Sequence, residues 1–127
     1  MSKISYRIGA IFYGIWGLLH IPIGYSVYMS GLSLEPGIVQ GRIFQVGFFL
    51  AAAGVAALAI ARWNWINHSA AYWSNVWLTT VVDIGFLLFI QFPGYVPLTR
   101  GLPGPITWVI ALIFSTIGYL QARRISA

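Results

Sequence analysis

The fold is decided by the stretch Val76–Ile90, which reads VWLTTVVDIGFLLFI. It is apolar enough to cross a membrane, and Asp83 is the one charged residue within it. The chain has only two acidic residues, and the other, Glu35, lies in a predicted loop. A carboxylate at the centre of a spanning helix costs about 2.5–3.5 kcal/mol on insertion scales, so such a residue is a candidate functional residue whose partner must be found.

The composition predicts an integral membrane protein. Of 127 residues, 59% are hydrophobic and 7% are charged, whereas soluble domains carry about 25% charged residues. The absence of cysteine excludes disulfides and thiolate metal sites. The net charge of +5 comes from scattered lysine and arginine residues rather than from a basic patch, so we predict no nucleic-acid partner.

Four segments are long enough to span a bilayer, which requires about 20 mainly apolar residues. They cover residues 6–28, 38–61, 71–92 and 105–122. Their connectors are short, so sequential neighbours should be antiparallel. We therefore predict an all-α fold, an up-down four-helix transmembrane bundle that forms a single domain over residues 1–127. The longest connector, residues 93–105, is rich in proline and glycine, and we expect it to be non-helical and to act as a lid.

Basic residues predict the orientation of the bundle. An even number of spans places both termini on one side, together with Lys3, Arg7, Arg62, Arg123 and Arg124. By the positive-inside rule this side is cytoplasmic. We expect the protein to lie in a bacterial plasma membrane with the connector 93–105 facing outward.

Each predicted helix carries a polar residue at a similar depth. Counted from the outer ends at 1.5 Å per residue, Asp83 lies about 14 Å deep, His20 about 12 Å, Gln45 about 10 Å and Ser115 about 15 Å. Arg42 lies nearer the surface and could reach inward. Because polar groups in lipid turn toward partners inside the bundle, these side chains should converge on its axis.

Helical spacing extends this predicted polar cluster. Asn75, Thr79 and Asp83 recur every four residues and share one face of the third helix. Trp16 lies one turn before His20 and could line a pocket. We predict that the catalytic residues are Asp83 and His20, and that the substrate-binding residues are Gln45, Arg42, Asn75, Thr79, Trp16 and Ser115.

The predicted cluster favours a pocket for a lipophilic small molecule or lipid. Burial and proximity have opposite effects on the proton affinities of a carboxylic acid and an imidazole, so Asp83 and His20 could exchange a proton with a bound molecule. Such chemistry would be isomerase- or hydrolase-like. No sequence motif calls for a cofactor or a metal. A structural alternative is an ion pair between Asp83 and Arg42, with His20 as a bystander.

Two further functions stay open at the level of sequence. The first is a proton-coupled carrier, which would act as a homodimer because four helices rarely enclose an alternating path. The second is an accessory subunit of a larger membrane complex. A dimer could form through the small residues Gly47, Ala51 and Gly54 on the second helix, but packing within the bundle is the favoured interpretation.

Two other features of the sequence yield local expectations. Pro22 follows His20 by two residues, and proline inside a helix removes a hydrogen bond, so we expect the first helix to bend there. His68 lies in a short polar and aromatic turn, where histidine and tryptophan commonly anchor a helix at the membrane surface.

Overall fold

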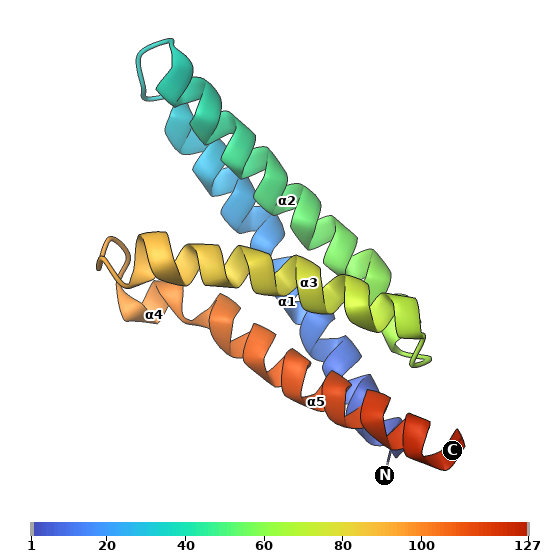
Figure 1. Ribbon diagram of the computed structural model, residues 1–127. Coiled ribbons are helices and arrows are strands. Elements are labelled where there is room, and N and C mark those ends of the chain that lie inside the picture. Colours follow the sequence, from blue (N-terminus) through green and yellow to red (C-terminus); the bar gives the residue numbers. More distant parts are fainter. Residues whose placement is uncertain (1, 127) are drawn as a thin grey trace.

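The protein is built from four long antiparallel helices. The computed structural model describes residues 2–126, and within them it contains helices and no strand. The long helices are α1 (Ser2–Gly31), α2 (Ile38–Asn64), α3 (Ser69–Phe86) and α5 (Pro103–Ser126). Successive long helices run in opposite directions, and both ends of the chain lie at the same end of the molecule (Figure 1). The predicted all-α, up-down four-helix fold is confirmed.

All four long helices have the length and apolar character of membrane spans. The qualifying segments are Lys3–Gly31, Ile38–Asn64, Ser69–Gln91 and Pro103–Arg124. Large apolar side chains cover the outside of the molecule, including Phe48, Phe89 and Phe92, which are 64%, 72% and 73% exposed. Helices satisfy their own backbone groups, which is the condition for lying in lipid. The chain is therefore a small integral membrane protein.

The connector after the third span is more helical than its composition predicted. α3 continues into a π-helical turn, η1 (Leu87–Gln91), and a single turn, α4 (Leu98–Gly101), precedes α5. The expectation that residues 93–105 are non-helical is thus wrong for part of the segment. Pro103 occupies the first turn of α5, where a missing N–H costs nothing because that donor has no partner inside the helix.

The two helices α1 and α2 touch through their backbones. A Cβ atom built on Gly17 would lie 2.5 Å from the carbonyl oxygen of Gly54. One built on Gly24 would lie 2.5 Å from the nitrogen of Ala51 and 2.6 Å from the oxygen of Gly47. The small residues of α2 therefore pack inside the chain, as the favoured interpretation held, because glycine lets two helices approach closely.

A second close contact joins α1 to α5. A Cβ atom on Gly9 would lie 2.7 Å from the nitrogen of Ser115, and one on Gly118 would lie 2.7 Å from the nitrogen of Tyr6. α1 is thus packed on both α2 and α5. In Figure 1 the hairpin of α1 and α2 diverges from α3 and α5 toward the end that bears α4. α1 stays a single helix through Pro22.

Candidate functional site

Asp83 is buried in α3 and is bonded to an indole. Its side chain is 1% exposed, and Oδ2 accepts a hydrogen bond of 2.5 Å from Nε1 of Trp16. The structure gives Oδ1 no hydrogen-bond partner within residues 2–126. Arg42, the partner in the structural alternative, is exposed and donates to Oε1 of Gln45 at 2.8 Å. The ion pair between Asp83 and Arg42 is therefore not formed.

His20 is held by the same tryptophan. Its ring stacks on the Trp16 ring with 3.7 Å between centroids, and Nδ1 lies 2.8 Å from the carbonyl oxygen of Trp16. A carbonyl oxygen only accepts hydrogen bonds, so Nδ1 carries the proton. In the neutral ring, Nε2 is then an acceptor with a free lone pair.

Oδ1 of Asp83 and Nε2 of His20 both lie close to Gly104. A Cβ atom built on Gly104 would lie 3.5 Å from Oδ1 of Asp83, 3.6 Å from Nε2 of His20 and 3.2 Å from its Cε1. Gly104 belongs to the first turn of α5. Three helices therefore bring a carboxyl oxygen, an imidazole nitrogen and a residue without a side chain to one point.

This point lies on the wall of a large cavity. The cavity has a volume of about 700 Å³ and takes its lining from all four long helices, η1 and α4. Its size falls in the range of small-molecule sites, about 300–1,000 Å³. His20, Asp83, Ser26 and Arg100 are its polar or charged lining residues among those that the structure describes. The rest of the wall is largely apolar and includes Leu19, Val27, Ile43, Leu50, Val82 and Phe86.

Part of the cavity lining is exposed and belongs to the membrane spans. Three of its lining residues, Ile23 on α1, Val46 on α2 and Ile90 on η1, are 41%, 47% and 37% exposed. These residues lie within three different spans. Arg100, on the exposed turn α4, is the cationic residue of the lining. A molecule in the cavity could thus reach hydrocarbon on one side and the basic α4 turn on another.

Gln91 binds the connector whose residues Val96, Arg100 and Gly101 line part of this cavity. It is buried at the end of η1, and its Nε2 donates to the carbonyl oxygen of Val96 at 3.1 Å. Its Oε1 has no hydrogen-bond partner, and it fills the space that a side chain on Gly101 would need. Gly101 therefore lets α4 pack on η1, and π-helical turns such as η1 are frequent at functional sites.

Two of the predicted substrate-binding residues bond to the protein instead of lining the cavity: Asn75 joins α3 to α2, and Thr79 bonds within α3. Thr79 donates to the carbonyl oxygen of Asn75 at 2.7 Å. Asn75 donates to Oδ1 of Asn64 at 2.7 Å and to the carbonyl oxygen of Ala57 at 3.3 Å. Both are fully buried. Their expected burial is observed, but their hydrogen bonds go to the protein.

The remaining predicted residues also lie outside the lining. Ser115 is 3.3 Å from the hydroxyl of Tyr13 and donates to the carbonyl oxygen of Leu112, so it joins α5 to α1. Gln45 is exposed together with Arg42. Trp16 is fully buried behind the wall. Of the eight residues predicted, the structure therefore brings two, Asp83 and His20, to the cavity.

The roles of Gly104 and Trp16 in the site could not be predicted from the sequence. Glycine beside two prolines reads as turn chemistry, and nothing in the sequence indicates that it faces His20. Trp16 was predicted to line a pocket, whereas it positions both polar residues by its indole N–H and its carbonyl oxygen. The signal available was its spacing of one helical turn from His20.

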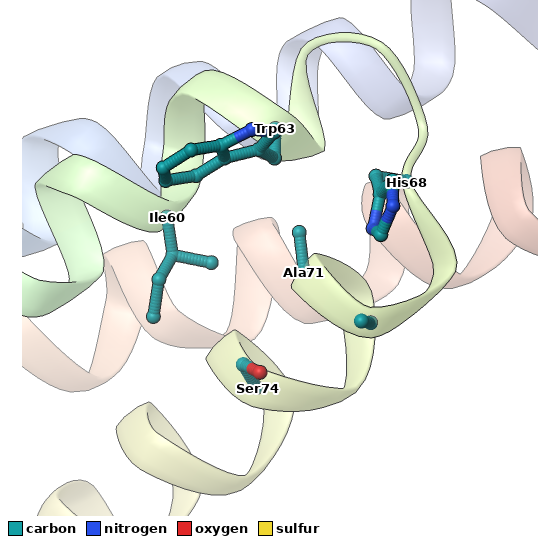
Figure 2. A pocket seen from close by; sticks show the side chains of 6 residues that line it. Ile60, Trp63, His68, Ala71 and Ser74 are labelled. Carbon is teal, nitrogen blue, oxygen red and sulfur yellow. The ribbon is translucent and has the colours of Figure 1, made fainter.

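A second, smaller hollow lies at the turn between α2 and α3. It has a volume of about 230 Å³, and Figure 2 shows Ile60, Trp63, His68, Ala71 and Ser74 around it. Trp63 is 48% exposed, and His68 is exposed as well. Exposed aromatic and imidazole rings at a span end are typical of membrane-interface anchors.

Comparison with protein-family models, curated proteins and solved structures finds no match.

Proposed function

We propose that this membrane protein binds a lipophilic small molecule in the 700 Å³ cavity and exchanges a proton with it. The molecule's apolar part would lie against the aliphatic wall, and its polar group against Asp83 and His20. The observation that supports this most strongly is the convergence of two unpartnered polar atoms, Oδ1 of Asp83 and Nε2 of His20, on Gly104. A ligand that brings hydrogen-bond donors would give both atoms a partner.

The hydrogen bonds of Trp16 suit the proposed proton exchange. Its carbonyl oxygen holds the proton of His20 on Nδ1, which leaves the lone pair of Nε2 directed at the ligand. Its indole N–H occupies Oδ2 of Asp83, which leaves Oδ1 as the reactive oxygen. A base within hydrogen-bond reach of a substrate proton is the geometric requirement for general base catalysis.

The test is to replace each polar residue and to follow both ligand binding and folding. Lipids and small molecules that co-purify with the wild-type protein would be identified by native mass spectrometry. We expect Asp83→Asn and His20→Ala to lose the bound molecule while keeping the helical circular dichroism spectrum. Ser115→Ala, which lies away from the cavity, is the control and should retain the molecule.

The melting temperature of Asp83→Asn distinguishes the proposed binding function from the role of an accessory subunit. Asn at position 83 can still accept from Trp16, and it removes a buried charge that has no cationic partner, so we expect Asp83→Asn to unfold at the same or a higher temperature. A structural role for Asp83 predicts a lower melting temperature and retention of any bound molecule. That result would refute the proposal.

The proton-coupled carrier remains an alternative that requires a second copy of the chain. The sequence offered the small-residue face of α2 as an interface for such a dimer, and much of this face is already packed on α1. The cytoplasmic location of both termini, the bacterial plasma membrane and the absence of a cofactor stay predictions from the sequence.

A further inference from the structure

We propose that the ligand is a lipophilic primary amine, bound as an ammonium ion between Oδ1 of Asp83 and Nε2 of His20. This inference rests on the proposed binding function and names the chemical class of its ligand. It follows from the hydrogen-bonding character of the part of the cavity beside Gly104, here called its deep end. There, Oδ1 of an ionised Asp83 and Nε2 of His20 are both acceptors, and the neighbouring N–H donors of Trp16 and His20 are already engaged.

The donors at this end are engaged with the protein itself. The N–H of Trp16 is bonded to Asp83, and the N–H of His20 is bonded to the carbonyl oxygen of Trp16. A ligand must therefore bring hydrogens. A hydroxyl group has one hydrogen and can serve one acceptor at a time, whereas an ammonium group has three and can serve both atoms together.

Charge points to the same class of ligand. A buried carboxylate is stable when it is paired, and in residues 2–126 the contact that Asp83 receives is a neutral indole N–H. The described lining of the cavity contains one acidic residue, Asp83, and one basic residue, Arg100, with His20 as the third titratable group. Asp83 is 1% exposed and Arg100 lies on the exposed turn α4. Solvent screens the arginine more strongly, so the deep end favours a cation.

The experiment compares four probes that share a twelve-carbon chain: dodecylamine, dodecyltrimethylammonium, 1-dodecanol and dodecanoate. Binding to the full-length protein in lipid nanodiscs would be measured by calorimetry, with empty nanodiscs subtracting partition into lipid. We expect dodecylamine to bind at least tenfold more tightly than the other three, because hydrogen bonds to charged groups are stronger than those between neutral groups. The trimethylammonium probe has the charge without the N–H donors.

Three variants locate the binding. Asp83→Asn should weaken dodecylamine about tenfold, by the same loss of a charged hydrogen bond, and leave dodecanol unchanged. Arg100→Gln should leave dodecylamine binding equal or slightly tighter. Arg42→Gln, which removes an exposed arginine away from the cavity, is its matched control and should change nothing.

Several results would overturn the inference. Equal binding of dodecanol and dodecylamine would indicate a neutral Asp83 that recognises alcohols. Tightest binding of dodecanoate, lost in Arg100→Gln, would indicate an anionic ligand held at α4. In both cases the cavity would still bind a lipophile and the proposed function would stand. Failure of all four probes to bind above the empty-nanodisc background would refute the proposed function together with this inference.

Discussion

At the scale of single residues, Trp16 organises the site without being part of its surface. One side chain bonds to Asp83 and stacks on His20, and the carbonyl oxygen of the same residue bonds to His20 as well. Because Trp16 and His20 are one helical turn apart, α1 alone sets the orientation of the imidazole. The carboxylate of Asp83 belongs to α3 and is held by the indole N–H of Trp16. The indole, the imidazole and the carboxylate are therefore oriented by contacts between two helices, α1 and α3.

Gly104 is the most direct target for mutation, because it lies beside both polar residues. In Gly104→Ala the new methyl group would lie 3.2 Å from Cε1 of His20 and 3.5 Å from Oδ1 of Asp83. It would narrow the space beside both polar atoms, and we expect binding of dodecylamine to fall about tenfold or more, since a single methylene in a pocket has an effect of this size. Calorimetry in nanodiscs would measure the change.

Gly85→Ala is the matched control for this substitution. No atom lies within 4 Å of a Cβ atom built on Gly85, which is inside α3. Alanine there should leave binding unchanged and raise stability by about 0.5–1 kcal/mol, because glycine is unfavourable inside a helix. Retention of full affinity in Gly104→Ala would show that the ligand's polar group lies elsewhere.

At the scale of elements, the glycine contacts between α1 and α2 determine the stability of the first hairpin. In Gly24→Ala the Cβ atom would meet the backbone of α2 at 2.5 Å, where no side chain can move aside. We expect this variant to lose roughly 1–3 kcal/mol of stability, as overpacked positions do. Thermal unfolding in detergent, followed by circular dichroism, would measure the loss.

Gly14→Ala on the same helix provides the comparison. Its Cβ atom would meet only a methyl group of Leu58, at 3.7 Å. This variant should be as stable as the wild type or slightly more stable. Equal melting temperatures for the alanine variants of Gly14 and Gly24 would contradict the close backbone contact between α1 and α2.

The helices and the central pair of polar residues could be predicted from the sequence, because apolar length and buried charge are properties of the chain itself. The direction in which each polar side chain points could not be predicted from the sequence. Arg42 and Gln45, three residues apart near the start of α2, satisfy each other on the exposed surface, so they have no need to turn inward. Asn75 and Thr79 do turn inward, but backbone carbonyls and Asn64 accept the hydrogen bonds that these side chains donate.

The cavity was equally beyond prediction from the sequence. Part of its lining comes from the turn α4, which packs against Gln91, and part from Gly104, which lies close to His20 and Asp83. Both depend on tertiary contacts that leave no periodic signal. Hydropathy detects the spans, but it does not report the angle at which one hairpin leaves the other.

At the scale of the whole molecule, the orientation in the membrane can be tested because the chain has no cysteine. We predict that Ser33→Cys and Thr99→Cys react with a membrane-impermeant thiol reagent added to intact cells, whereas Ser69→Cys reacts only after permeabilisation. The physical reason is the excess of lysine and arginine at the end that carries both termini. All three positions are exposed in the folded chain. The opposite labelling pattern would reverse the predicted topology.

We predict that the ligand enters from the bilayer past the exposed lining residues Ile23, Val46 and Ile90, and this route determines whether its concentration in lipid or in water governs binding. A lipophile that enters from the bilayer equilibrates with the pool dissolved in lipid, and its concentration in water matters only through its partition coefficient. Occupancy should then follow the mole fraction of ligand in the membrane. Diluting the ligand with more lipid, at a fixed total amount in the sample, would empty the cavity as effectively as removing ligand from the solution.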